Sequence, residues 1–280
     1  MEYLGFGIGI RNRHFSRILS APVQAEWFEA LTENYLGMEG FPHSDALNSL
    51  LKVRQNFPIT LHGVSLSIGS ADPLNQKYLR RLQRLQEIIQ PAWISDHLCW
   101  TSMAKQNLHD LLPIPFTEEL FDHVANRVAE VQNFLGRSLV LENLSAYVNY
   151  SQSTMSEFEF LGRLVKKTGC RLLVDVNNIY VNSVNHGLDA MECLHAIPKD
   201  AVQQFHLAGH TKVGNILIDS HGASVSAAVW KLYGEAVRIF GPISTIIEWD
   251  ENIPDYEVLE GEMLRAKGEF HAVAARSETI

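Results

Sequence analysis

Histidine and carboxylate side chains stand at the ends of apolar segments along most of this chain. No local motif explains the series, which runs from residue 33 to residue 248. Imidazole and carboxylate groups bind zinc, manganese and iron, so the series predicts a metal site if the fold gathers these endings. They are Leu61-His62, Asp96-His97, Leu141-Glu142-Asn143, Val174-Asp175, Phe205-His206 and Ile247-Glu248, with Glu33-Asn34 as a weaker early member.

Three histidines and three carboxylates among these endings are predicted metal ligands. Each histidine, taken alone, is more simply explained as a hydrogen-bonded core residue. Three carboxylates gathered at one site would repel each other, and their pKa values would rise. A bound cation removes that cost and requires deprotonated ligands. The six predicted ligands are His62, His97, His206, Glu142, Asp175 and Glu248.

A second set of polar residues follows His206. His210 lies four positions after it, and Asp219-Ser220-His221 comes nine residues later. Residues two apart on an extended chain point to the same side, so Asp219 and His221 can approach one ion. The alternative is an ordinary turn with Asp219 as a surface charge. We expect the metal role because the pair comes shortly after His206.

Two further side chains are candidates for the same site. Asp175 is the expected bridging ligand, and Asn178 offers a side-chain carbonyl that a hard cation accepts. Asparagine in such a stretch is otherwise most often a turn former. Asp250 follows Glu248 by two residues and points to the same side. Asp250 can be a ligand, a substrate contact or a proton acceptor, and the sequence leaves these three roles open.

Eight short apolar strands alternate with amphipathic helices, which predicts a single (β/α)8 TIM barrel. The C-terminal ends of its strands face one side, so they would gather the ligands. We expect the barrel over residues 1–270 and a C-terminal tail over 271–280. The expected strands are Leu4–Ile10, Trp27–Leu31, Ile59–His62, Trp93–His97, Leu139–Glu142, Arg171–Val176, Val202–Leu207 and Ile243–Trp249. The clearest helices are Tyr78–Gln90, Phe116–Leu135, Phe158–Lys167 and Val225–Phe240, and loops at the catalytic face are expected over Gly63–Pro73, Leu98–Pro115, Asn177–Leu188 and Ala208–Ala223.

Composition narrows the class of protein. The chain has 280 residues, 46% of them apolar, and a formal net charge of −9. An acidic protein is a poor general binder of nucleic acid, which needs a basic surface. No apolar run approaches the roughly 20 residues that span a bilayer, and the N-terminus lacks the features of a signal peptide. Three widely spaced cysteines, Cys99, Cys170 and Cys193, suit reduced thiols. We expect a cytoplasmic protein without membrane or nucleic-acid partners.

The ligand types narrow the choice of metal. Imidazole and carboxylate without thiolate suit iron, manganese or zinc, and two histidines with one carboxylate form the pattern of iron oxygenases. The predicted ligands exceed what one ion uses, so two or three ions with bridging carboxylates fit better. Composition and spacing do not name a substrate.

Taken together, nine motifs resemble the multinuclear non-haem iron-dependent oxidative enzymes. This family long stood as a domain of unknown function and includes the iron subunit of methanobactin biosynthesis. The resemblance extends to about Phe270. The motifs are Gly7-Ile8-Gly9-Ile10-Arg11, Glu33-Asn34-Tyr35, residues 61–69, Ser95-Asp96-His97-Leu98, Leu141-Glu142-Asn143, residues 175–182, residues 206–210, Asp219-Ser220-His221-Gly222 and Glu248-Trp249-Asp250.

The resemblance implies a barrel akin to xylose isomerase and endonuclease IV that holds two or three iron ions, although zinc or manganese can be present after purification. Members use O2 to oxidise side chains, commonly cysteine, of a ribosomally made precursor peptide, and they usually act with a small partner protein that binds the peptide leader. Asp250 matches a position near the substrate. The implied metal ligands are His62, His97, Glu142, Asp175, Asn178, His206, His210, Asp219, His221 and Glu248.

Two alternatives to the oxidative enzyme stay open at this point. One is a redox-neutral enzyme that uses zinc or manganese on the same scaffold, either a sugar isomerase or a phosphodiesterase. The other is a metal-binding protein without catalysis. A fold does not decide between such functions.

Overall fold

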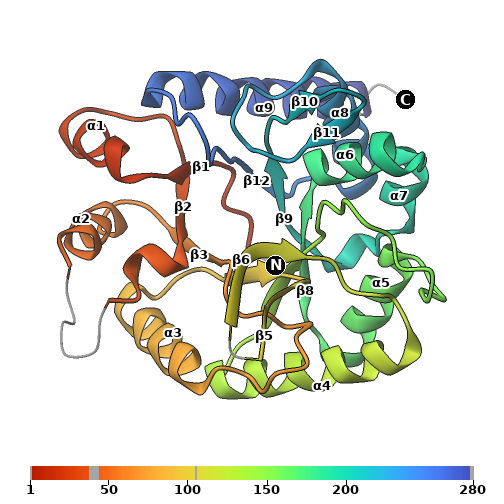
Figure 1. Ribbon diagram of the computed structural model, residues 1–280. Coiled ribbons are helices and arrows are strands. Elements are labelled where there is room, and N and C mark those ends of the chain that lie inside the picture. The colour runs from red at the N-terminus through yellow and green to blue at the C-terminus, as the bar shows by residue number, and fades with distance from the viewer. Residues whose placement is uncertain (1, 38–43, 105, 278–280) are drawn as a thin grey trace.

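Eight parallel strands close into a barrel in the computed structural model, which describes residues 2–37, 44–104 and 106–277. Around the barrel the order is β1-β12-β9-β8-β7-β4-β3-β2 (Figure 1). The closed parallel sheet confirms the predicted TIM barrel. Its strands are β1 (Phe6–Ile10), β2 (Trp27–Leu31), β3 (Ile59–Gly63), β4 (Ile94–His97), β7 (Leu139–Glu142), β8 (Arg171–Asp175), β9 (Val202–Leu207) and β12 (Ser244–Ile247).

Helices surround this barrel, and the four helices expected from periodicity are all present. Their ends follow the local sequence: Ser156 accepts a hydrogen bond from Glu159 N at the start of α5, and Gly169 ends that helix in a left-handed conformation. The helices are α1 (Phe15–Ser20), α2 (Asp45–Arg54), α3 (Gln76–Ile89), α4 (Glu118–Leu135), α5 (Glu157–Thr168), α6 (Val176–His186), α7 (Ala190–Ala196), α8 (Ala227–Phe240) and α9 (Tyr256–Ser277), with 3-10 turns η1 (Asn12–His14), η2 (Thr32–Tyr35) and η3 (Lys199–Ala201). Helix α9 therefore continues into the expected tail.

The inside of the barrel changes from apolar to polar along its strands. Trp27, Trp93, Val140, Leu173 and Ile246 form a buried apolar cluster. Because side chains two apart on a strand share a side, the inward residue that follows is a carboxylate on each of four strands. The successive pairs are Trp27 and Glu29, Val140 and Glu142, Leu173 and Asp175, and Ile246 and Glu248. Thus the apolar cluster supports a layer of charged side chains at the C-terminal ends of the strands.

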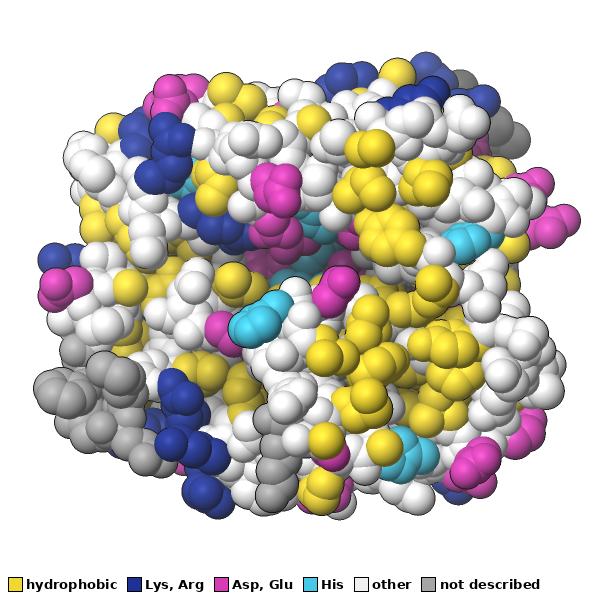
Figure 2. Space-filling view, viewed as in Figure 1, with side chains coloured by type: hydrophobic (Ala, Val, Ile, Leu, Met, Phe, Trp, Pro, Cys, Tyr) yellow, Lys and Arg dark blue, Asp and Glu magenta, His cyan; other side chains and the backbone are white. Residues whose placement is uncertain are grey.

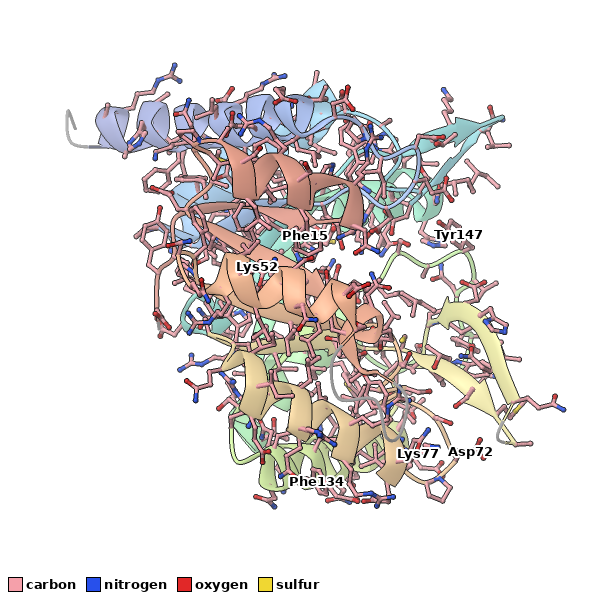
Figure 3. The ribbon with its side chains drawn as sticks, turned by 90° about the vertical axis from the view of Figure 1, so that its left-hand side faces the viewer. Phe15, Lys52, Asp72, Lys77, Phe134 and Tyr147 are labelled. Atoms are coloured by element: carbon pink, nitrogen blue, oxygen red, sulfur yellow. The ribbon has the colours of Figure 1, made fainter. Side chains whose placement is uncertain are left out.

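Two hairpins stand on the face where these strands end. The first is β5 (Trp100–Met103) with β6 (Gln106–Leu112), and the second is β10 (Thr211–Val213) with β11 (Ile216–Ile218). Tyr147 lies on the face from which both hairpins project (Figure 3). The expected loops over Leu98–Pro115 and Ala208–Ala223 contain these hairpins.

The prediction of a loop over Asn177–Leu188 is wrong, because helix α6 occupies most of that segment. The Asp175 side chain caps this helix directly after β8 and accepts a hydrogen bond from Asn178 N at 2.6 Å. Gly187, with a φ of 69°, ends it. Because β8 passes directly into α6, no change in amino-acid composition separates the strand from the helix. The sequence therefore does not show whether a loop or a helix follows the strand. Among the described residues, no helix is long and apolar enough to cross a membrane.

Candidate metal centre

All the predicted ligands except His210 line or adjoin one cavity of about 490 Å³ at the C-terminal end of the barrel. Acidic and histidine side chains gather in the hollow at the centre of this face (Figure 2). Asp175 and His206 are fully buried beside the lining residues. The predicted site residues that line the cavity are His62, His97, Glu142, Asn178, Asp219, His221, Glu248 and Asp250.

The first ligand group joins β3, β4 and β7. His62 Nε2 and His97 Nε2 each lie 3.2 Å from Glu142 Oε2. The other ring nitrogen of each histidine is held: His62 Nδ1 lies 2.8 Å from Ser95 Oγ, and His97 Nδ1 lies 3.0 Å from the Gly63 carbonyl oxygen. Such contacts fix the ring orientation of metal-bound histidines. Both Nε2 atoms are thereby aimed at the same carboxylate oxygen.

The second group shares Glu142 with the first. His206 Nδ1 lies 3.7 Å from Glu142 Oε1 and 2.8 Å from Glu248 Oε2. Together with Asp175, these residues offer four ligand atoms that all lie within 4.8 Å of one another. Glu142 therefore turns one oxygen toward each group, which is the arrangement of a bridging carboxylate.

The third group comes from the segment after β11. His221 Nε2 lies 2.7 Å from Asp219 Oδ1 and 3.5 Å from Asp175 Oδ2, while its Nδ1 lies 3.1 Å from Glu248 Oε2. His221 has a φ of 44°, so the Asp219–His221 segment is not extended as expected. The two side chains meet because His221 adopts a left-handed backbone conformation, and not by the alternation of a strand.

The donor atoms of all three groups fit a set of cations. Seven buried atoms of this cluster have no hydrogen-bond partner within the described part of the chain, although several imidazole nitrogens lie 2.7–3.7 Å from a carboxylate oxygen. Buried polar atoms are normally paired. Nitrogen and oxygen atoms that converge without hydrogen-bond geometry are satisfied by an ion between them. These atoms are His62 Nε2, Glu142 Oε2, Asp175 Oδ2, Asn178 Oδ1, His206 Nδ1, His206 Nε2 and His221 Nε2. The nearest carboxylate to His206 Nε2 is that of Glu29, whose Oε1 lies at 2.7 Å.

The electrostatics of the cluster also favour cations. Burial raises the pKa of Glu142 well above its ordinary value, and the carboxylates of Glu248 and Asp175 add to the rise. Burial also raises the pKa of Asp175 to about 7. Burial lowers the pKa of His206, but the Glu248 and Glu29 carboxylates outweigh it, so that pKa lies well above its usual value. Without metal, protons compensate the crowded negative charge, and a cation would take their place.

A comparison with protein families agrees with this donor set. The family model described as "RiPP precursor modification enzyme MbnB/TglH/ChrH" matches residues 5–270, where RiPP denotes a ribosomally synthesised and post-translationally modified peptide. The chain belongs to this family. The RiPP precursor modification enzymes are metal-dependent, and the match confirms the resemblance found in the motifs.

Curated relatives match the chain over nearly its whole length, and solved structures share its fold. A UPF0276 protein of Anaeromyxobacter sp. (strain Fw109-5) is 49% identical over 94% of this chain and 92% of its own length. One of Acaryochloris marina is 45% identical over 94% and 93%. An L-ribulose 3-epimerase structure has a TM-score of 0.62 at 11% identity, covering 100% of this chain and 98% of the epimerase. Endonuclease IV from Thermus thermophilus has a TM-score of 0.59 at 14% identity, covering 98% and 100%. These two structures confirm the fold alone.

Two polar residues of the predicted series lie outside the cluster. His210 Nδ1 lies 2.7 Å from Asn177 Oδ1, and the amide of Asn177 donates to Asp219 Oδ1 at 2.8 Å. His210 thus reaches the site only through Asn177. Glu33 accepts hydrogen bonds from Tyr78 Oη at 2.9 Å and from Val64 N. The turn η2 after β2 carries Glu33 toward α3 instead of toward the cavity.

One buried carboxylate at this site was missed by the strand-end pattern. Glu29 lies inside β2, only 3% exposed, with its Oε1 atom 2.7 Å from His206 Nε2. The pattern overlooked it because Glu29 lies two positions before the end of its strand. The alternation of inward side chains along β2, which places Glu29 after Trp27, was the signal that could have revealed it.

At the mouth of the cavity, Asp250 differs from the ligands by its exposure. Its side chain is 46% exposed, it forms an ion pair with Arg11, and its Oδ2 lies 3.2 Å from His221 Nδ1. Arg11 itself is largely buried and also lies 4.0 Å from Glu248. Asp250 therefore touches both the ligand cluster and solvent, and its carboxylate lies close enough to His221 and Glu248 to share an ion with them.

Replacing Asp219 or His221 by alanine is expected to remove part of the bound metal while the barrel still folds. Both residues lie on a segment outside the barrel strands, and the first two ligand groups do not need Asp219. Metal content by inductively coupled plasma mass spectrometry, with circular dichroism as the folding control, tests this. Full metal content and normal activity in both variants would show that the pair is an ordinary turn.

Proposed function

We propose that this protein is a multinuclear non-haem iron enzyme that uses O2 to oxidise cysteine residues of a ribosomally synthesised precursor peptide. The observation that carries the proposal is the set of three His/carboxylate groups, two of which share Glu142, at the base of an open cavity. Two histidines with a carboxylate suit iron that reacts with O2. Membership of the RiPP precursor modification enzymes supports a peptide as the substrate.

The proposed ligand set follows the donor atoms in the cavity. Two or three iron ions would be held, with zinc or manganese able to replace them in purified protein. His210 is assigned to support Asp219 through Asn177. The proposed ligands are His62, His97, Glu142, Asp175, Asn178, His206, Asp219, His221 and Glu248.

Bound iron would supply the electron-transfer chemistry that the side chains lack. The protein's own residues bind and orient the peptide and move its protons. Asp250, at the cavity mouth and paired with Arg11, is placed to accept the proton of the substrate thiol. In the proposed oxidation, two electron pairs and four protons leave the cysteine residue, and one O2 accepts them and is reduced to two water molecules. This reaction lowers the peptide mass by four hydrogens. If one oxygen atom is inserted instead, the other becomes water with one electron pair and two protons from the peptide, and the peptide gains one oxygen and loses two hydrogens.

The partners follow from the proposed reaction. The substrate is a precursor peptide that contains cysteine, and a small leader-binding protein is the proposed second partner. The widely spaced cysteines of the chain fit a reducing compartment, so the reaction is proposed to take place in the cytoplasm. The net charge of −9 does not favour nucleic acid as a substrate.

The test begins with a search of the neighbouring genes for a short cysteine-containing precursor peptide. Iron-loaded protein is then incubated with that peptide, any leader-binding partner and O2. The peptide mass is expected to change, and the change is expected to require both iron and O2. Asp250 also lies close enough to His221 and Glu248 to share an ion. Asp250→Asn should still keep its metal, because Asp250 is 46% exposed at the cavity mouth and asparagine retains one side-chain oxygen. It should slow the reaction by about 10²-fold or more, as loss of a general base does.

An unchanged peptide mass with iron-loaded protein would contradict the proposal, as would the same change without O2. Zinc-loaded protein is the matched control, because zinc fills the same donors but does not change its oxidation state. Turnover by the zinc form would favour the redox-neutral alternative. A slower reaction of Asp250→Asn would then show a role of Asp250 in that redox-neutral reaction.

A further inference from the structure

The Glu29 carboxylate is held from two sides within the barrel. Its Oε2 accepts hydrogen bonds from Thr60 Oγ1 at 3.0 Å and from Gln204 Nε2 at 2.7 Å. Gln204 Oε1 in turn accepts from Trp93 Nε1 at 2.5 Å, so the polar chain is anchored in the apolar cluster beneath the site. Glu29 Oε1 is left to face His206 Nε2 at 2.7 Å.

The histidines of the cluster differ in what holds their second nitrogen. His62 is held by the Ser95 hydroxyl and His97 by the Gly63 carbonyl, both neutral groups. His206, which is fully buried, faces the carboxylate of Glu29. A carboxylate behind a metal-bound imidazole fixes its tautomer and makes its other nitrogen a stronger donor. An uncharged partner, such as a hydroxyl or a carbonyl group, strengthens the other nitrogen less than a carboxylate does.

We propose that Glu29 is a positioning residue of the metal centre: it binds the Nε2–H group of His206 and directs His206 Nδ1 toward Glu142 and Glu248. This inference rests on the proposed metal centre, though not on the identity of the metal or of the substrate. Glu29 makes His206 a stronger donor than His62 and His97, whose second nitrogens face neutral groups. His206 lies between the bridging carboxylate Glu142 and Glu248.

Direct metal binding by Glu29 is the competing role. Its carboxylate, His62 and His206 also lie close enough to share an ion. The contacts favour positioning, because Oε2 is already used by Thr60 and Gln204 and because Oε1 faces the His206 nitrogen on the far side of the ring from Glu248. The two roles predict different metal counts.

The test compares Glu29→Gln with Thr60→Val, which removes one hydrogen bond to Glu29 without touching His206. Zinc is the probe, and its affinity is measured by competition with a chelator. Glu29→Gln is expected to keep the wild-type number of zinc ions and to bind one of them about 10–100-fold more weakly. Thr60→Val is expected to change affinity by a few-fold at most. Loss of one whole equivalent in Glu29→Gln would overturn positioning in favour of direct binding.

A second measurement reports on the hydrogen bond itself. In zinc-loaded wild-type protein labelled with 15N-histidine, His206 is expected to carry its proton on Nε2, with a downfield proton resonance that moves upfield in Glu29→Gln. A proton on Nδ1 in the wild type would overturn the proposal even if the variant did not fold. Unchanged zinc affinity together with an unchanged resonance would do the same. Neither readout uses a peptide, so a failure of the proposed oxidation would be seen separately as an unchanged peptide mass.

Discussion

Glu142→Gln is expected to release more than one equivalent of metal. We expect this to be the largest loss of metal from any single replacement of a ligand by an uncharged side chain of similar size. Glu142 Oε2 lies 3.2 Å from both His62 Nε2 and His97 Nε2, and Oε1 faces His206. Replacing the carboxylate by an amide removes one negative charge and one donor oxygen from two groups at once. Asp175→Asn should act in the same direction, because Asp175 Oδ2 lies between the second group and His221.

Metal per protein chain, measured after anaerobic purification, checks this expectation. Glu157→Gln is the matched control: Glu157 is a glutamate whose burial raises its pKa to about 7, yet it accepts its hydrogen bond from Leu144 N away from the ligand groups. The control should keep the wild-type metal content. If both Glu142→Gln and Asp175→Asn also kept it, the shared cluster would be the wrong description of the site.

The position of most site residues could be predicted because residues at the ends of different strands in the sequence lie close together in a parallel barrel. His62, His97, Glu142 and Asp175 lie at or next to the last residues of their strands, and parallel strands in a barrel end on one face. The sequence alone could therefore place side chains from distant segments around one cavity. Strand ends were also marked by the change from apolar to polar residues.

What the sequence did not reveal depends on side-chain direction and local backbone conformation. Glu29 lies inside a strand, and only the inward alternation along β2 distinguishes it from a misplaced surface residue. The left-handed conformation of His221, with its φ of 44°, falls on the histidine itself and not on the neighbouring Gly222, where a sequence would suggest it. Asn178 could be proposed as a ligand, but its place at the start of α6 depends on Asp175 as both helix cap and site residue.

The protein without metal is expected to become less stable as the pH rises from 7 to 9. The pKa values of Glu142, His206 and His221 all lie well above their ordinary values, by burial for the acid and by nearby carboxylates, which outweigh burial, for the histidines. Wherever such a group keeps a proton in the folded protein that the unfolded chain has lost, raising the pH favours unfolding by about 1.4 kcal/mol per pH unit for that proton. His62 and His97, whose pKa values are lowered first of all by burial, are neutral in both states over this range. These two histidines therefore do not alter the expected fall in stability with rising pH.

Metal should remove this dependence, because a bound cation takes the place of the protons and favours the deprotonated ligands. The measurement is the free energy of unfolding in urea at pH 7, 8 and 9 for chelator-treated and zinc-loaded protein, with Glu142→Gln as a third, metal-free sample. The gap between loaded and metal-free protein should widen with pH, and Glu142→Gln should show a shallower fall because it lacks one of the retained protons. Parallel curves for the loaded and metal-free forms would mean that the ligands do not exchange protons for metal. In that case the repulsion between the crowded carboxylates would be compensated by the rest of the folded protein and not by bound cations.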